Sequence, residues 1–242
     1  MRWQPIEEND PIRAMAADEA LLATIDRGKT CLRAYTWRDP ALTIGVFCSL
    51  DSPPPIPWAR RITGGGLVLH GFDLTFAIVS DDLPNRTAYL KVGEALANAL
   101  QQLGVTAKLG GETRNVHGTY ACFAQPVAGD IMVEGRKLAG YAMRRRRGRI
   151  LIQGSLQLSS PTPELIEIVA GYEDYSANSC GLNEFLKERL EIGKIVGNFA
   201  EELARIFPEF AICSPDEPDE AIIVEYISHY IDPELTPARR NN

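Results

Sequence analysis

The side chains best suited to chemistry lie in two short stretches. The first is Arg60–His70, where two arginines precede three consecutive glycines and a histidine ends the run. Ordering glycine costs the most backbone entropy, so a triplet points to a close approach by a ligand or another backbone. Bare amide N–H groups and a guanidinium can together hold an anion. The alternative is a flexible loop between two strands, and the stretch alone favours neither.

The second stretch, residues 134–140, holds a lysine just past a tight turn. Alternation along a strand would point Lys137 inward, between Arg136 and Leu138, which point outward. An inward ammonium is costly unless it meets an anion or a carbonyl oxygen. The alternative is a solvent-facing hairpin lysine, which spacing alone favours.

Cys122 and Cys180 are the candidate nucleophiles. A thiol becomes reactive when a nearby cation such as Lys137, or a helix N-terminus, lowers its pKa. Cys180 precedes a predicted helix, whereas Cys122 follows a polar, glycine-rich stretch. A small buried hydrophobe is the usual alternative for a free cysteine. His70 is equally well a base or a satisfied polar residue at a strand end.

Composition narrows the class of protein. The net charge of −7 over 242 residues argues against general nucleic-acid binding. No apolar run approaches the roughly 20 residues that span a bilayer, and Met1–Pro11 lacks the pattern of a signal peptide. The five cysteines are odd in number and scattered, and form no CxxC pair. We therefore expect a cytoplasmic protein without a membrane partner, a disulfide framework or a metal site.

Hydrophobic periodicity and turn residues predict the elements. The first helix, Ala14–Arg27, should carry Asp18 and Glu19 on its polar side, and Lys108–Tyr120 should be an irregular loop. Further helices are expected at Tyr89–Leu103, Pro163–Ala170 and Asp219–Tyr230, with one or two within Asn183–Ile206. Strands are expected at Thr30–Tyr35, Ala41–Cys48, Leu67–His70, Leu74–Val79, Asp130–Glu134, Arg136–Met143 and Ile150–Leu158.

This order of elements is not a regular βαβ alternation. It favours an α+β fold with a mixed, mostly antiparallel sheet flanked by helices. The glycine triplet lacks the spacing of a Rossmann or Walker motif. We expect a single domain over residues 1–242, with a possible small C-terminal helical appendage from about residue 208. Five arginines between positions 144 and 149 are either a solvated hairpin tip or a surface that steers an acidic protein partner.

Together these motifs resemble the lipoate–protein ligase and octanoyltransferase family, whose shared unit is the biotin/lipoate protein ligase catalytic domain. Each motif is weak alone, but they follow the family's order over about residues 15–160. The matching residues are Asp18-Glu19-Ala20-Leu21-Leu22, Arg33-x-Tyr35-x-Trp37, Leu42-Thr43-Ile44-Gly45, Arg60-Arg61-x-Thr63-Gly64-Gly65-Gly66-x-Val68-x-His70, Asp73-Leu74-Thr75-Phe76, Gly135-Arg136-Lys137-Leu138-Ala139-Gly140 and Gln153-Gly154-Ser155.

The resemblance implies a class II synthetase-like fold with one pocket for a C8 acyl chain. The glycine-rich loop would cover the acyl group and any adenylate or thioester attached to it, and Arg61 would help hold the charged part. Lys137 would bind the acyl carbonyl or phosphate oxygen. The family often has a histidine where this chain has Gln153. The implied acyl- or adenylate-binding residues are Arg61, Thr63, Gly64, Gly65, Gly66, Val68, His70, Trp37, Gly135, Gly140 and Gly154, with Trp37 and Val68 as walls.

The family uses two mechanisms, and the resemblance leaves both open. Transferases pass octanoyl through a cysteine thioester without a cofactor. One branch places that cysteine in a Cys-Phe-x-x-Pro segment, which matches Cys122 to Pro126, 15 residues before Lys137. Another branch uses a Cys-Gly pair, loosely matched by Cys180-Gly181. Ligases instead use ATP and Mg²⁺ to form lipoyl-AMP.

The expected partners follow from these mechanisms. The donor would be octanoyl–acyl carrier protein for a transferase, or free lipoate for a ligase. The acceptor would be a lysine on a lipoyl domain or on the glycine cleavage H protein. We favour transfer through Cys122, with an ATP-dependent ligase and a non-catalytic acyl or acyl-carrier binding module as alternatives.

Overall fold

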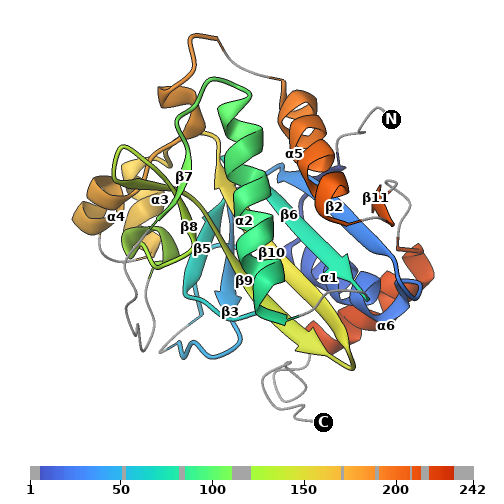
Figure 1. Cartoon of the computed structure of the whole chain (residues 1–242). Helices are drawn as coiled ribbons and strands as arrows, with labels where there is room; N and C mark the ends of the chain where they lie inside the picture. The colour runs from blue at the N-terminus through green and yellow to red at the C-terminus, as the bar shows by residue number, and fades with distance from the viewer. Residues whose placement is uncertain are drawn as a thin grey trace.

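A computed structural model of the chain describes residues 6–50, 53–81, 85–110, 121–169, 172–188, 191–207, 209–213 and 218–231. An eight-stranded sheet runs through its centre (Figure 1), in the order β1-β2-β6-β10-β9-β8-β7, with β11 also paired to β2. β1 and β11 run parallel to β2, and the other neighbours are antiparallel. The mixed, mostly antiparallel sheet is therefore confirmed. Its strands are β1 (Ile6–Glu8), β2 (Thr30–Trp37), β6 (Asp73–Ser80), β7 (Lys108–Gly110), β8 (Asp130–Val133), β9 (Arg136–Arg146), β10 (Arg149–Gln157) and β11 (Phe210–Ile212).

A second, three-stranded sheet holds the glycine-rich stretch. Its order is β4-β3-β5, with β3 parallel to β4 and antiparallel to β5. Its strands are β3 (Ala41–Gly45), β4 (Trp58–Arg61) and β5 (Leu67–His70). The glycines connect β4 to β5. These two strands lie on either side of the central strand β3. β2 and β3 are consecutive in the chain but belong to different sheets.

Helices cover both faces of the main sheet (Figure 1). α2 (Asn85–Gln101) and α5 (Ile192–Ile206) pack on the face that carries Phe76 and Ile78. α1 (Pro11–Thr24) packs on the opposite face, which carries Ala77 and Val79, and α6 (Glu220–Ile231) packs on α1. All eight residues of β6 are consequently buried, and the run Phe76–Val79 is apolar on both faces of the strand.

The shorter helical segments lie beside the second sheet. They are α3 (Pro163–Ile168), α4 (Tyr172–Asn178), η1 (Cys122–Ala124) and η2 (Leu182–Glu184), the last two of 3₁₀ type. α4 packs on η1 and was not expected from the sequence. β7 also differs from expectation, because Lys108–Gly110 pairs with β8 instead of starting an irregular loop. The rest of that expected loop, residues 111–120, lies outside the described residues.

Asp18 and Glu19 were expected on the polar side of the first helix, but the structure gives them no solvated side. Both side chains are buried, because α1 is enclosed between the main sheet and α6. Each carboxylate meets an arginine instead: Asp18 pairs with Arg33, and Glu19 with Arg146. A helix covered on two sides has no solvated face, so its charged residues must find partners inside the protein.

The number and spacing of the cysteines also failed to indicate a disulfide. Cys31 and Cys213 form a disulfide, with their Cα atoms 5.9 Å apart. They are separated by 182 residues, and only the parallel addition of β11 to β2 brings them together. Within the stretch considered above as a possible appendage, β11 pairs with β2 of the main sheet and α6 packs on α1.

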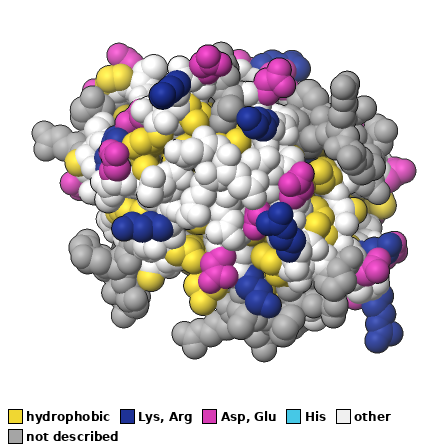
Figure 2. All heavy atoms as spheres, turned by 45° about the horizontal axis from the view of Figure 1, so that its top comes forward, with side chains coloured by type: hydrophobic (Ala, Val, Ile, Leu, Met, Phe, Trp, Pro, Cys, Tyr) yellow, Lys and Arg dark blue, Asp and Glu magenta, His cyan; other side chains and the backbone are white. Residues whose placement is uncertain are grey.

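The described surface carries mixed charges. Figure 2 shows acidic and basic side chains interspersed over the face that includes the top of Figure 1. In the described part of the chain, no helix has the length and apolar character needed to cross a membrane.

Candidate active site

A cavity lies where the second sheet meets β9, β10 and η1. Its lining joins the glycine-rich stretch (Arg61, Gly65, Val68 and His70) to the two reactive candidates, Lys137 and Cys122. Segments that are far apart in the sequence therefore share one cavity.

Lys137 points into the protein and is fully buried. Its Nζ lies 2.8 Å from Asp130 Oδ2, and it donates hydrogen bonds to the Cys122 carbonyl oxygen at 3.0 Å and to Cys122 Sγ at 3.3 Å. Burial by itself would lower the pKa of Lys137, but Cys122 and Asp130 outweigh it and the pKa rises above its usual value. The cavity thus contains a lysine that stays charged at neutral pH.

The β8–β9 hairpin aims this lysine. Its turn residues Glu134 and Gly135 have φ of 49° and 80°, as a tight hairpin turn with the twist of the flanking strands requires. The register of β8 against β9 shifts between Ile131 and Met132, and such an irregularity re-aims nearby side chains. Gly135 therefore acts through the turn and does not line the cavity.

Two further glycines leave space for neighbouring side chains. A Cβ on Gly140 would lie 2.6 Å from both Cε and Nζ of Lys137, so only glycine leaves room for the ammonium. A Cβ on Gly154 would lie 2.1 Å from the ring of Phe76, so glycine lets β10 pass over that ring. Both glycines line the cavity.

Cys122 is the thiol beside Lys137. It is half-buried on η1, which α4 holds in place: Asn178 Nδ2 donates to the Ala124 carbonyl oxygen at 2.8 Å, and the rings of Phe123 and Tyr175 stack 6.1 Å apart. Its sulfur lies on the cavity wall.

Cys180 also contacts Lys137, but through its backbone, because its N–H donates to the Lys137 carbonyl oxygen at 3.0 Å. Its side chain is fully buried and does not line the cavity, and its Sγ points to the Arg136 carbonyl oxygen at 3.8 Å. Burial raises the pKa of this thiol to about 12, so it stays neutral. Of the two candidate nucleophiles, Cys122 is the one whose sulfur contacts the Lys137 ammonium.

Arg61 forms hydrogen bonds with the glycine-rich loop. Its guanidinium donates to the carbonyl oxygens of Gly64 and Gly66 at 2.9 and 2.7 Å, and to Thr43 Oγ1 at 3.2 Å. Gly65, at the centre of the loop, has φ of +87°. The loop lies so close to β3 that a Cβ on Gly45 would be 1.9 Å from the Gly65 carbonyl oxygen. In this structure Arg61 therefore shapes the loop.

His70 has partners on both ring nitrogens. Nε2 lies 2.8 Å from Thr43 Oγ1 and Nδ1 lies 2.9 Å from Asp73 Oδ2. Burial would raise the pKa of Asp73, but His70 and two hydroxyl donors hold it below its usual value. Trp37 stacks behind the imidazole at 4.5 Å, so it supports His70 instead of lining the cavity, whereas Val68 does line it.

Two functional candidates escaped the sequence analysis. Asp130 looked like an ordinary acidic residue at the start of a strand, and nothing in its spacing pairs it with Lys137. Gln153 appeared only as a departure from a family histidine. It lines the cavity and accepts a hydrogen bond from Thr63 Oγ1 at 2.7 Å, so the Thr63 hydroxyl is directed toward Gln153.

At the junction of the two sheets the fold brings together a buried lysine, a carboxylate and a thiol, as expected of a catalytic domain. The chain belongs to the lipoyl protein ligase A/B catalytic domain family, whose sequence profile matches residues 10–204. It is therefore an enzyme of the acyltransferase and ligase class.

Individual relatives agree with this assignment. The chain is 32% identical over 229 residues to octanoyltransferase LipM of Moorella thermoacetica, covering 82% of this chain and 83% of that protein. It is 34% identical over 193 residues to octanoyltransferase LipM of Brevibacillus brevis, covering 69% and 70%.

Solved structures share the fold. A lipoate-protein ligase A bound with ATP superposes with a TM-score of 0.75 at 24% identity, covering 94% of this chain and 95% of that one. A bi-partite lipoate protein ligase from Thermoplasma acidophilum gives 0.73 at 20% identity, covering 98% and 97%.

Proposed function

We propose that this protein transfers an octanoyl group, by way of a thioester on Cys122, to a lysine of a lipoyl-carrier protein. The observation that carries the proposal is the 3.3 Å contact between Lys137 Nζ and Cys122 Sγ. A charged lysine beside a thiol stabilises the thiolate, which is the nucleophilic form. The names of the octanoyltransferase relatives support the same reaction.

In the first half-reaction, the Cys122 thiolate attacks the carbonyl carbon of an octanoyl thioester. A new sulfur–carbon bond forms, the donor's carbon–sulfur bond breaks, and the donor leaves as a thiol with the proton that Cys122 gave up. Negative charge develops on the carbonyl oxygen during the attack, and the buried ammonium of Lys137 is the nearby group that stabilises it.

In the second half-reaction, the acceptor lysine attacks the Cys122 thioester as a free amine. An amide forms, and Cys122 leaves with the proton lost by the amine. Neither step uses ATP, Mg²⁺ or another cofactor. We propose octanoyl–acyl carrier protein as the donor, and a lipoyl domain or the glycine cleavage H protein as the acceptor.

Intact-mass analysis after incubation with octanoyl–acyl carrier protein tests the proposal. We expect one octanoyl adduct on the wild type and on Cys180→Ser, no adduct on Cys122→Ser, and transfer to an added lipoyl domain without ATP. An undiminished adduct on Cys122→Ser contradicts the assignment of the nucleophile. Modification that requires ATP and lipoate would establish the ligase instead, and no modification under either condition would favour a binding module.

A further inference from the structure

The hydroxyl of Thr63 is the first link in a buried chain of hydrogen bonds that passes the cavity wall at Gln153. Thr63 Oγ1 donates to Gln153 Oε1 at 2.7 Å, and Gln153 Nε2 donates to Asp18 Oδ2 at 2.7 Å. All three side chains are more than nine-tenths buried. The chain thus connects the glycine-rich loop, through β10, to helix α1.

The direction of each bond in this chain is fixed. Burial raises the pKa of Asp18, but Arg33 Nη1 pairs with its Oδ1 at 2.8 Å, and a carboxylate paired with an arginine can only accept hydrogen bonds. The Gln153 amide must therefore turn its NH₂ group toward Asp18 and its oxygen toward the loop. That oxygen in turn requires a donor, which the Thr63 hydroxyl supplies.

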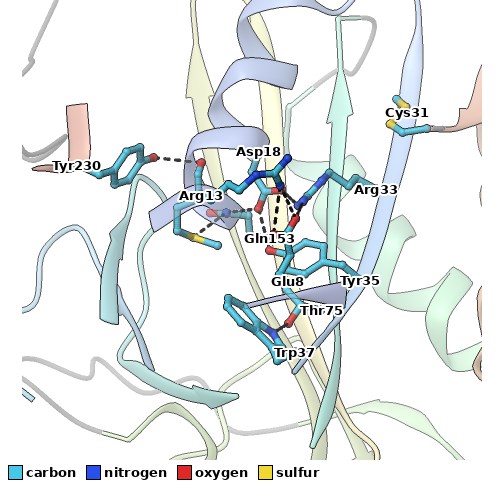
Figure 3. A network of polar contacts seen from close by, with 12 residues as sticks. Glu8, Arg13, Asp18, Cys31, Arg33, Tyr35, Trp37, Thr75, Gln153 and Tyr230 are labelled. Carbon is cyan, nitrogen blue, oxygen red and sulfur yellow. Dashed lines mark hydrogen bonds and ion pairs between the residues drawn. A yellow bond between two sulfur atoms is a disulfide. The ribbon is translucent and has the colours of Figure 1, made fainter. Parts of the chain in front are cut away.

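The chain ends in a charge network that spans three elements of the fold. Figure 3 shows Gln153 and Arg33 converging on Asp18, with Glu8 also beside the guanidinium of Arg33. Arg33 pairs with both Glu8 and Asp18, and Tyr35 OH donates to Asp18 Oδ2 at 3.2 Å. A network with this many partners is rigid, so it is a firm anchor for the amide.

The loop is therefore held from two sides. Arg61 binds the carbonyl oxygens of Gly64 and Gly66, and Gln153 holds the side chain of Thr63, just before the first glycine. Glycine backbone has little conformational preference of its own, so a three-glycine loop takes its shape from such anchors.

We propose that Gln153 is a positioning residue, which fixes the glycine-rich loop over the acyl cavity by joining Thr63 to the buried carboxylate of Asp18. The inference rests on the proposed function only for its kinetic consequence. Loss of the anchor leaves the reacting groups Lys137 and Cys122 in place, but the loop no longer fits the bound acyl group. The effect therefore falls on the KM of the octanoyl donor more than on kcat.

The test uses full-length Thr63→Val and Gln153→Met, which remove the hydrogen bonds with little change in side-chain size. We expect a rise on the order of fivefold in donor KM with kcat nearly unchanged, as for the loss of one buried hydrogen bond. The double variant should be no worse than either single variant, because both break the same link. Thr63→Ser keeps the donor hydroxyl, so its donor KM should equal that of the wild type.

Thr30→Val is the matched control. Thr30 Oγ1 lies 2.7 Å from Ser80 Oγ, and both residues are buried, but neither lines the cavity. This variant therefore loses a similar buried hydroxyl contact, and we expect its donor KM to stay at the wild-type value. Equal increases in donor KM in Thr30→Val and Thr63→Val would mean that general destabilisation causes the increase, and this result would overturn the inference.

Amide hydrogen exchange across residues 62–66 reads the loop without relying on activity. We expect exchange about fivefold faster in Thr63→Val and Gln153→Met and unchanged in Thr30→Val. Unchanged loop exchange in the first two variants overturns the positioning role. If the wild type forms no octanoyl thioester, the proposed function fails, while the exchange data still decide the role of Gln153.

Discussion

At the scale of single residues, the site depends on a charge balance that only the folded structure assembles. Lys137 is buried between a carboxylate and a thiol, and neither Asp130 nor Cys122 adjoins it in the sequence. Side chains alternate along a hairpin strand, so the sequence allowed Lys137 to point either inward or toward solvent. Its partners come from another strand and from a 3₁₀ turn, and no local pattern indicates them.

Asp130→Asn tests this balance. Asparagine keeps the shape of the side chain but leaves the Lys137 ammonium buried without its carboxylate partner. We expect a loss of about 3–5 kcal/mol in the free energy of unfolding, as for a broken buried ion pair, together with slower formation of the Cys122 thioester. Chemical denaturation and timed intact-mass sampling measure the two effects.

The control is the double variant Asp130→Asn with Lys137→Met, which removes both charges. It should regain much of the lost stability but form no thioester at an appreciable rate. Wild-type stability in the single variant would show that the ion pair contributes nothing to folding.

Asp73 gives a prediction of pH dependence. Its pKa in the folded protein is lowered, so the folded state releases this proton more readily than the unfolded chain does. The stabilisation is therefore present above the unfolded pKa of about 4 and is lost as the pH falls through the folded value. Asp73→Asn should lower the free energy of unfolding by about 1–3 kcal/mol at pH 7, and this difference should shrink below about pH 4. Urea titrations at pH 7, 5 and 3.5 measure it; a constant difference contradicts the assignment.

At the scale of elements, hairpins were the most predictable features. β8, β9 and β10 lie close to their expected bounds, because tight turns and period-two alternation are local signals. Helix α4 was missed because Tyr172–Asn178 has no apolar stripe, and Tyr175 is its buried contact to η1. β11 spans three residues, and its pairing with β2 depends on parts of the chain that are distant in sequence.

The missed helix nevertheless supports the proposed nucleophile, because Asn178 holds the turn that carries Cys122. Asn178→Ala removes the hydrogen bond to the Ala124 carbonyl oxygen and frees η1 to shift. We expect a loss of about 1 kcal/mol in stability and a slower rate of thioester formation at saturating donor. Ser176→Ala, an exposed change on the same helix, should alter neither quantity. Unchanged acylation kinetics in Asn178→Ala would show that α4 does not position the thiol.

At the scale of the whole molecule, the sequence indicated the fold class, and its motifs indicated the family. It did not indicate which contacts join the two ends of the described chain to the core. The buried network of Glu8, Arg33 and Asp18 joins the first strand to the core, and the disulfide joins the last. Both depend on contacts between distant segments. This is why α1 looked amphipathic in the sequence and is enclosed in the structure.

The disulfide gives the prediction at this scale. The Cys31–Cys213 link closes a loop of 182 residues, and cross-linking such distant positions restricts the unfolded chain. Cys213→Ser should lower the free energy of unfolding by about 2–4 kcal/mol. Reductant should lower the Tm of the wild type to that of the variant and leave the variant unchanged. Neither cysteine lines the cavity, so thioester formation at 25 °C should be the same in both proteins.

Thiol counting gives an independent check on the same link. The unfolded, unreduced wild type should contain three titratable thiols, from Cys48, Cys122 and Cys180. Cys213→Ser should contain four, because its Cys31 becomes free. Five thiols in freshly prepared wild type, with a Tm that does not respond to reductant, would mean that the two cysteines lie side by side as thiols. β11 and α6 would then be held to the rest of the molecule by non-covalent contacts, which include the backbone pairing of β11 with β2, the Tyr230–Glu19 hydrogen bond and the Arg13–Glu220 ion pair.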